Sequence, residues 1–366
     1  MSNDQGTVHC ERINQVALIT LDRPRALNAL SHAMVLRLHD VLDQIEADVS
    51  LRAVVLRGAG PKAFCAGGDV IALANSVRDG SSLHRTFFID EYRLDWRIHT
   101  FGKPVVAFMH GIVMGGGMGL AQGASLRLVA DNVRMAMPET RIGLIPDVGA
   151  SYFFSKMPAP LAAYLTLTGA HLNASDALFA NLADARSRVN DPDALPALLT
   201  EIAWPTHDGL DPLQPLRQAL VAPSAATHLD GAHLPEQCPL IFRHFDPVQT
   251  LGTLVADLAA SPSEWAQATV QTLRAHSPLM MALTLVALQR GRQLDLPACF
   301  QMEYGLVQHA LMCGEFTEGV RAHLIDKDRT PSWTIPRIEA LDEQVIESAL
   351  RAAQRLSPER LDHEPS

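Results

Sequence analysis

The sequence predicts an α/β fold followed by a mainly helical C-terminal region, and three observations support this prediction. In the first half, short hydrophobic runs alternate with stretches in which hydrophobic residues recur at helical spacing. Turns rich in glycine and proline separate these segments. Beyond about residue 170, the strand-like runs give way to long stretches rich in Ala and Leu. Strands that alternate with helices are typical of α/β domains.

The first half contains four expected strands, each a short hydrophobic run bounded by turn residues. These runs are Val16–Leu21, Ala53–Leu56, Val105–Met109 and Leu126–Ala130. Ser31 precedes a stretch with hydrophobic residues at helical spacing, so we expect it to cap a helix there. Further helices are expected over residues 70–77 and from residue 115 onward.

The second half is expected to be helical, with loops around short helices over residues 190–247, where Pro, Asp and Gly are frequent. Beyond these loops we expect four helices, over Glu264–Arg274, Leu279–Arg290, Leu296–Met312 and Glu339–Leu356. The sequence therefore predicts two domains, a core over residues 1–190 and a mainly helical region over residues 191–366.

Composition excludes several classes of protein. With 366 residues, 48% of them hydrophobic, the chain can bury a sizeable core. A formal net charge of −10 argues against binding to nucleic acid or to an anionic membrane. The five cysteines are scattered and the first residues resemble neither a secretory signal nor a transit peptide, so we expect a cytoplasmic protein. Residues 104–126 lack charged side chains, but their six glycines favour a buried strand, turn and helix over a membrane span.

Three segments concentrate the residues that could bind a ligand or transfer a proton. They are Lys62–Asp69, His110–Gly119 and Met137–Gly149. The first two are glycine-rich turns that lead into expected helices, where backbone N–H groups favour a phosphate or a developing oxyanion. Glycines at this spacing can also serve helix packing alone. We assign packing to Gly119 and Gly123, which leaves residues 115–117 free for function, although glycine content alone supports function no better than packing.

The third segment carries two carboxyl groups in apolar surroundings, those of Glu139 and Asp147, each directly after a proline. Taken singly, Asp147 is better interpreted as a cap for a helix over residues 148–156, while capping and function are equally supported for Glu139. Carboxyl groups buried beside an oxyanion site would have a raised pKa and could transfer protons. For His110 we favour a structural role, and for Cys65 burial as a small hydrophobic residue over nucleophilic catalysis.

In combination, these segments resemble the crotonase (enoyl-CoA hydratase/isomerase) superfamily, whose fold is a spiral of β-β-α units. The early segments Arg23–Pro24 and Leu27–Leu30 resemble its CoA-contacting loop. The turns at Ala66–Asp69 and Gly115–Gly117 resemble its two oxyanion-hole elements. This resemblance implies that residues 1–190 form an acyl-CoA-binding core.

The same resemblance implies roles for individual residues. It implies that the N–H groups of Gly68 and Gly116 bind the oxyanion. It further implies that three residues line the CoA channel: Leu27, Lys62 and Ala66.

A narrower resemblance, to 3-hydroxyisobutyryl-CoA hydrolases, covers most of the chain and weakens across residues 185–260. It rests on Phe87–Tyr92, His110–Gly117, Met137–Thr140, Ile145–Gly149, Met302–Tyr304 and Phe316–Asp328, with Pro331 and Trp333. It implies that Glu139 and Asp147 are catalytic or substrate-positioning acids and that Glu91 is a further substrate contact.

The reaction that the resemblance favours is hydrolysis of a short 3-hydroxyacyl-CoA thioester. Hydratases of the superfamily have a second glutamate just after the triple glycine, where this chain has Gly119. An isomerase or hydratase reaction on another acyl-CoA remains open, as do a non-catalytic acyl-CoA binder and an interaction protein whose glycines serve packing alone. Glu139 could be a general base or a nucleophile.

The resemblance also implies which partners to expect. We expect an acyl-CoA substrate and no metal or redox cofactor, since coenzyme A is part of the substrate. We expect no nucleic-acid or membrane partner, and a homo-oligomer, either a trimer or a hexamer.

Overall fold

The computed structural model describes residues 5–205, 211–223, 229–246 and 249–357. The chain divides into two compact units, each assembled from three separate segments. Unit 1 comprises Met1–Gly68, Leu94–Met135 and His171–Leu234, and unit 2 comprises Asp69–Arg93, Ala136–Ala170 and Pro235–Ser366. The two sequence-continuous domains over residues 1–190 and 191–366 stay a prediction.

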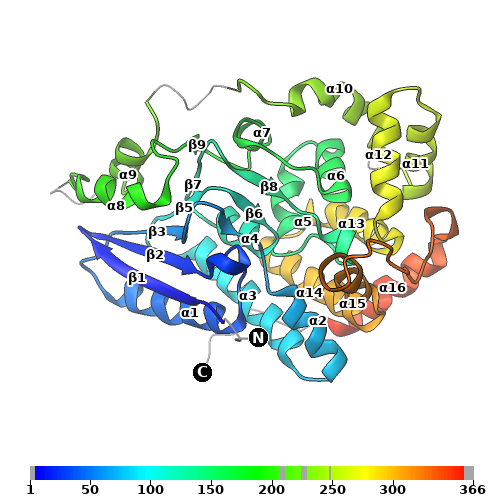
Figure 1. Ribbon diagram of the computed structural model, residues 1–366, viewed down its shortest axis with the longest axis horizontal. Helices are drawn as coiled ribbons and strands as arrows, with labels where there is room; N and C mark the ends of the chain where they lie inside the picture. The colour runs from blue at the N-terminus through cyan, green and yellow to red at the C-terminus, as the bar shows by residue number, and fades with distance from the viewer. Residues whose placement is uncertain (1–4, 206–210, 224–228, 247–248, 358–366) are drawn as a thin grey trace. The chain divides into compact units, whose positions relative to one another are not determined.

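Unit 1 contains a six-stranded sheet in the order β1-β2-β3-β5-β7-β9 (Figure 1). Its strands are β1 Thr7–Ile13, β2 Val16–Asp22, β3 Ala53–Gly58, β5 Val105–Met109, β7 Leu126–Val129 and β9 Ala185–Arg186. Only β1 runs antiparallel to its neighbour in this sheet, and the other pairs are parallel. The four strands expected from the sequence are confirmed within two residues at each end, and β1 and β9 are additional.

Buried aliphatic residues hold one face of this sheet against two short helices. Val16, Val55 and Leu128 of the sheet belong to one hydrophobic cluster with Leu199 of α8 (Leu195–Thr200) and Leu216 of α9 (Leu213–Leu220). Parallel strands buried in this way read as continuous hydrophobic runs, which is why they could be recognised from the sequence.

A second sheet, of three strands in the order β4-β6-β8, positions the glycine-rich turns. Its strands are β4 Ala63–Cys65, β6 Ile112–Met114 and β8 Arg134–Ala136. Residues 104–126 therefore form two strands, β5 and β6, before α4 (Gly116–Gln122). None of the helices within the described residues is long and apolar enough to cross a membrane.

Helix α1 (His32–Ala47) begins where the sequence predicts, because the Ser31 hydroxyl accepts a hydrogen bond from the N–H of Met34 at 3.2 Å. Helix α3 (Leu83–Thr100) was not expected. The remaining helices before the C-terminal region are α2 Val70–Asp79, α5 Ala150–Phe153, α6 Ala159–Thr168 and α7 Ala174–Phe179.

The C-terminal region is helical, as predicted, with the helices α10 to α16 running from light green to red in Figure 1. They are α10 Leu234–His244, α11 Leu251–Ala260, α12 Glu264–Ala275, α13 Pro278–Gly291, α14 Leu296–Met312, α15 Glu315–Val320 and α16 Glu343–Leu356. The four expected helices correspond to α12, α13, α14 and α16. The loops expected over residues 190–247 contain α8, α9 and α10, and residues 206–210, 224–228 and 247 lie outside the described part of the chain.

Candidate active site

The two glycine-rich turns lie next to each other in unit 1. They follow β4 and β6, which pair in parallel through Ala63 with Ile112 and Cys65 with Val113. Since the carboxyl ends of parallel strands meet at one edge of a sheet, the segments that follow them are neighbours. A Cβ atom placed on Gly67 would lie 3.4 Å from the backbone nitrogen of Gly116. The structure thus brings together two turns that are nearly fifty residues apart in sequence.

Helix α4 begins directly at the second turn. Gly115 adopts φ 51°, and its carbonyl oxygen accepts the first bond of the helix from the N–H of Met118 at 2.7 Å. The N–H groups of Gly116 and Gly117 precede that first bond and therefore have no acceptor within the helix. This is the backbone geometry from which an anion or a polarised carbonyl oxygen could be bound.

Gly117 has a packing role within the second glycine turn, and a function of residues 115–117 stays a prediction. A Cβ atom on Gly117 would lie 2.2 Å from the carbonyl oxygen of Cys65, so close packing alone requires glycine there. Gly123 has the packing role expected of it, because its Cβ would lie 3.2 Å from the carbonyl oxygen of Asp95.

The loop that contains Leu27 is tied to the first glycine turn. Leu27 and Asn28 adopt φ values of 54° and 56°. The carbonyl oxygen of Leu27 accepts the N–H of Ala66 at 3.1 Å, and Leu30 forms an isolated parallel bridge with Gly68. The structure thus brings Leu27, Ala66 and Gly68 together.

The buried side chain of Asn28 holds this loop in place. Its Nδ2 donates to the carbonyl oxygens of Ala59 at 3.0 Å and Ala63 at 2.7 Å. Sequence reasoning gave Asn28 no role of its own. Asparagine adopts positive φ more often than most other residues, so its presence in this segment was a sign of such a turn. Lys62, also expected in the CoA channel, has an exposed side chain.

Unit 2 gathers three buried carboxyl groups, those of Glu91 in α3, Glu139 and Asp147. Their exposed fractions are 2%, 5% and 4%. Burial raises the pKa of Glu91 well above its ordinary value, and the negative charges of Asp147 and Glu139 raise it further. Burial and then the charge of Asp147 raise the pKa of Glu139 in the same way. The three acids that sequence reasoning selected therefore form one cluster, in which the charge of one raises the pKa of another.

Two oxygens of this cluster are buried without a hydrogen-bond partner among the described residues. Oε1 of Glu91 and Oε2 of Glu139 are buried and accept no hydrogen bond within the described part of the chain. A buried polar atom without a partner costs free energy that a bound hydroxyl or water can recover. Such atoms in a protein interior are expected at a functional site.

Asp147 does not cap a helix, and that interpretation of the sequence is wrong. Helix α5 begins at Ala150 with no side-chain cap, and only the backbone carbonyl of Asp147 accepts the N–H of Ala150, at 2.9 Å. Positive φ angles at Val148 and Gly149 turn the chain between the acid and the helix. The Asp147 carboxyl group accepts the hydroxyl of Tyr92 instead, at 2.6 Å.

The Tyr92 hydrogen bond and burial act on Asp147 in opposite directions. The pKa of Asp147 is raised from 3.8 to about 6, because burial raises it by more than the Tyr92 hydrogen bond lowers it. Burial and the nearby Asp147 raise the pKa of Tyr92 well above 10, so Tyr92 keeps its proton as a donor at neutral pH. Sequence reasoning gave Tyr92 no role, and its signals were its place beside Glu91 and within the segment Phe87–Tyr92 that carries the narrower resemblance.

His110 and Cys65 have the structural roles expected of them. Nε2 of His110 lies 2.9 Å from the carbonyl oxygen of Gly60, and its ring stacks on Phe108 with centroids 5.3 Å apart. Cys65 is fully buried, as a small hydrophobic residue would be.

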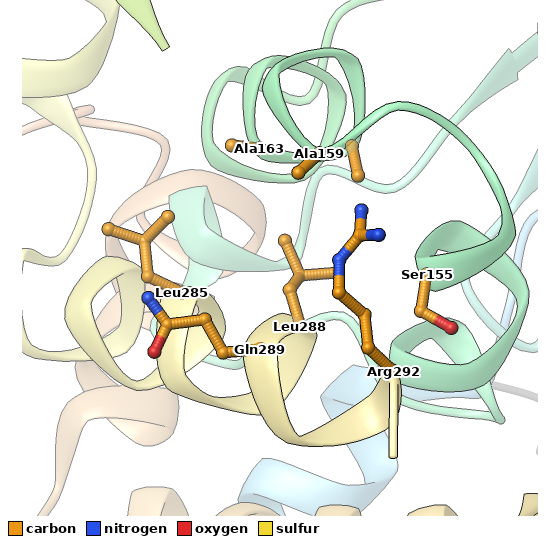
Figure 2. Close-up of a pocket in the computed structure, with 8 residues that line it drawn as sticks. Ser155, Ala159, Ala163, Leu285, Leu288, Gln289 and Arg292 are labelled. Carbon is orange, nitrogen blue, oxygen red and sulfur yellow. The ribbon is translucent and has the colours of Figure 1, made fainter. Parts of the chain in front are cut away.

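A small pocket in unit 2 lies between α6 and the end of α13, where Leu288 and Arg292 face Ala159 and Ala163 (Figure 2). Its volume of about 10 Å³ is that of roughly one water molecule, so no acyl chain fits there. A more open pocket of about 560 Å³ in unit 1 is lined by Leu178, Phe179, Asn181, Ala183, Asp184, Arg217 and Leu229. Neither pocket contains a residue predicted to act in the site.

Known sequences resemble this chain over nearly its whole length. The family pattern described as enoyl-CoA hydratase/isomerase matches residues 16–350. A Danio rerio protein named 3-hydroxyisobutyryl-CoA hydrolase, mitochondrial, is 35% identical over 351 residues, 95% of this chain and 90% of the relative. The Arabidopsis thaliana protein named 3-hydroxyisobutyryl-CoA hydrolase 1 is 33% identical over 370 residues, 96% of this chain and 93% of the relative.

Solved structures resemble it equally widely. A carnitinyl-CoA dehydratase from Mycobacterium thermoresistibile has a TM-score of 0.84 and 31% identity, with 98% of this chain and 99% of that chain covered. An enoyl-CoA hydratase from Rhodobacter sphaeroides 2.4.1 has a TM-score of 0.80 and 36% identity, with 94% and 96% covered. The predicted fold, an α/β core of the crotonase type followed by a helical region, is confirmed.

Proposed function

Because the chain belongs to the enoyl-CoA hydratase/isomerase family, we propose that it is an acyl-CoA thioester hydrolase whose substrate is a short 3-hydroxyacyl-CoA such as 3-hydroxyisobutyryl-CoA. The observation that carries this proposal is the buried cluster of Glu91, Glu139 and Asp147. Relatives in an animal and a plant that carry the hydrolase name cover nearly all of this chain.

In the proposed reaction, the thioester oxygen lies between the N–H groups of Gly68 and Gly116. Attack on the carbonyl carbon turns that oxygen into an oxyanion, which the two N–H groups stabilise. Loss of one such donor typically costs about 3–4 kcal/mol of barrier. The proximity of the two glycine turns in unit 1 supports this role.

Glu139 supplies the base or the nucleophile of the proposed reaction. As a base it takes a proton from water, whose oxygen bonds to the carbonyl carbon while the carbon–sulfur bond breaks and coenzyme A leaves as a thiol. As a nucleophile, its carboxylate bonds to the carbonyl carbon while the carbon–sulfur bond breaks and coenzyme A leaves as a thiolate, which takes up a proton. Water then hydrolyses the mixed anhydride to the free acid and restores the Glu139 carboxyl group. Burial and the charge of Asp147 raise its pKa, which makes the Glu139 carboxylate a stronger base, and its unpaired buried oxygen supports contact with a ligand.

Asp147 and Glu91 bind the 3-hydroxyl group of the substrate in this proposal. Tyr92 fixes the orientation of the Asp147 carboxyl group through one of its oxygens. A carboxyl group held in this way can accept the hydrogen bond of an alcohol without losing further side-chain freedom. Leu27, Lys62 and Ala66 would contact coenzyme A.

A thiol-release screen tests the proposal. Short acyl-CoA thioesters with and without a 3-hydroxyl group are each mixed with the protein, and free thiol is measured over time. We expect release, and faster release from the hydroxylated thioesters. Binding of the thioesters without any turnover would instead make the chain a non-catalytic acyl-CoA binder. If the protein does not bind coenzyme A at all, the glycine turns serve packing alone.

A hydratase or isomerase reaction on another acyl-CoA is the second candidate. The two solved structures are named a dehydratase and a hydratase, which favours it. Gly119 stands where hydratases of the superfamily have a glutamate, which disfavours it. Free coenzyme A appears only with hydrolysis, whereas hydration changes the absorbance of the enoyl group and leaves the thioester intact.

Location, assembly and cofactor use stay predictions. The Danio rerio relative is named mitochondrial, so cell fractionation has to decide between mitochondria and the cytoplasm that the sequence predicts. Light scattering with size-exclusion chromatography tests the expected trimer or hexamer. Activity that is unchanged by a chelator is the outcome expected for an enzyme without a metal.

A further inference from the structure

We propose that Glu303, in α14, is a positioning residue that fixes the turn after Asp147 and thereby the direction of the Asp147 carboxyl group. This inference rests on the proposed function of Asp147 and extends the site into the C-terminal helical region. Neither sequence reasoning nor the names of the relatives give Glu303 a role.

Both carboxyl oxygens of Glu303 are bound to the turn. Oε2 accepts the N–H of Gly149 at 2.7 Å. Oε1 accepts the N–H and the hydroxyl of Ser151, at 2.8 Å and 2.5 Å. Glu303 is completely buried, and it thus supplies from another helix the cap that α5 lacks in its own sequence.

The turn that Glu303 holds is strained. Val148, directly after Asp147, has φ 54°, a conformation that β-branched residues rarely adopt. Strain of this kind persists only where the surroundings fix the backbone, and it concentrates at functional sites. Gly149 follows at φ 85°, and a Cβ atom there would lie 3.1 Å from Leu296 of α14. Helix α14 therefore packs against the turn as well as bonding to it.

The same helix also supports the other partner of Asp147. Tyr92 stacks on Phe300 with ring centroids 5.4 Å apart and meets Tyr304 edge-on at 6.5 Å. Phe300, Glu303 and Tyr304 lie on one face of α14, since residues three and four apart are neighbours on a helix. Glu303 thus holds the backbone two and four residues after Asp147, and Tyr92 holds the Asp147 carboxyl group.

Glu303 is suited to positioning and not to contact with substrate. Both of its oxygens are already bound to Gly149 and Ser151, and its side chain is fully enclosed. Burial, followed in smaller measure by the charge of Asp147, raises its pKa to about 8. Both oxygens act as acceptors in these bonds, so Gln at this position keeps the size of the side chain but only one of the two acceptor oxygens.

The sharpest variant is Glu303→Gln. Glutamine offers one oxygen and one NH₂ group, so one of the two backbone N–H groups loses its acceptor and faces another donor. The turn then relaxes and the Tyr92–Asp147 bond weakens. We expect the ratio of kcat/KM for a 3-hydroxyacyl-CoA to that for the unhydroxylated acyl-CoA to fall roughly tenfold or more.

A readout independent of activity is the carboxyl carbon resonance of Asp147 in protein labelled with ¹³C-aspartate, assigned by its absence in Asp147→Asn. Because the Tyr92 hydrogen bond lowers the pKa of Asp147, we expect Glu303→Gln to move the titration midpoint upward, in the direction of Tyr92→Phe. If the wild-type protein hydrolyses no thioester, the proposed function fails, yet this titration still decides the role of Glu303.

Asp176→Asn is the matched control. Asp176 is another buried carboxyl group that accepts backbone N–H groups, from His233 at 2.7 Å and Leu234 at 2.8 Å, but it lies in unit 1. It should lower stability while leaving the substrate ratio and the Asp147 titration unchanged.

Two results would overturn the proposal. One is a folded Glu303→Gln protein with the wild-type ratio and the wild-type titration. The other is a protein that loses activity equally on both substrates with an unchanged titration, as a purely structural role predicts. If Glu303→Gln does not fold, Ser151→Ala takes its place, because it removes only the hydroxyl contact with Glu303. It must then shift the substrate ratio and the Asp147 titration in the same directions by a smaller factor. A folded Ser151→Ala protein without these shifts also overturns the proposal.

Discussion

The hydroxyl group of Tyr92 donates a hydrogen bond of 2.6 Å to Oδ2 of Asp147, and both side chains are buried. This bond joins α3 to a turn more than fifty residues further along the chain. It orients Asp147, whose negative charge raises the pKa of Glu91 and of Glu139. The Tyr92 hydroxyl therefore acts on the whole cluster through Asp147. The predictions below follow from this cluster and from the glycine turns.

Replacement of Asp147 by Asn tests the proposed contact with the 3-hydroxyl group. The amide keeps the size of the side chain but removes one acceptor and the negative charge. We expect kcat/KM for a 3-hydroxyacyl-CoA to fall by roughly a factor of 10–100 more than for the unhydroxylated thioester. Equal losses on the two substrates, measured by thiol release, would remove this role from Asp147.

Replacement of Tyr92 by Phe should shift the pH dependence of the reaction. The Tyr92 hydrogen bond lowers the pKa of Asp147, so its loss raises that pKa above about 6. The acidic limb of kcat/KM then moves to higher pH. Tyr164→Phe removes a buried hydroxyl that contacts Gln237 at 3.2 Å and is the matched control. A Tyr92→Phe profile that coincides with this control would contradict the account.

Stability should fall as pH rises from about 4.5 to about 8. The pKa of Glu303 is raised from 4.5 to about 8 in the folded protein, so in this range the folded state binds more protons than the unfolded state. The stabilisation is complete below the unfolded pKa and is lost as pH rises through the folded pKa. Urea unfolding at several pH values measures the slope, and Glu303→Gln should flatten it. An identical slope in both proteins would show that Glu303 does not titrate there.

Gly117→Ala should destabilise unit 1, because its methyl group would lie 2.2 Å from the carbonyl oxygen of Cys65. Overpacking of this kind typically costs about 1–3 kcal/mol. Gly252→Ala is the matched control, since Gly252 lies in α11 with the nearest atom 3.9 Å from the added Cβ. That change should be neutral or stabilise by up to about 1 kcal/mol. Denaturant unfolding measures the stability of both variants. Equal stabilities would rule out the tight contact between Gly117 in α4 and Cys65 in β4.

The sequence predicts the buried elements well because their hydrophobic patterns are unambiguous. Val105–Met109 and Leu296–Met312 are a strand and a helix with the expected bounds. Strand β1 was missed because most of its side chains are exposed at the sheet edge and give no hydrophobic run. Helix α3 was missed because polar residues interrupt its apolar face.

The carboxyl residues of the site could be selected from the sequence, but their surroundings could not. Local spacing allowed Asp147 to be interpreted as a helix cap. In the structure, Tyr92 binds its carboxyl group and Glu303 binds the turn that follows it, and both come from distant parts of the chain. Contacts of this kind depend on tertiary packing, which no local pattern encodes. The packing role of Gly117 in α4 likewise depends on Cys65 in β4.

The central claim is that Glu139 drives hydrolysis of a hydroxylated thioester. The most direct measurement follows 3-hydroxyisobutyryl-CoA by liquid chromatography with wild-type protein and with Glu139→Gln. The account predicts free coenzyme A and 3-hydroxy acid in equal amounts from the wild type, and turnover lowered roughly a hundredfold or more in the variant with binding of coenzyme A retained. Near-normal turnover by Glu139→Gln, or a wild-type product that is an enoyl-CoA with its thioester intact, would contradict it.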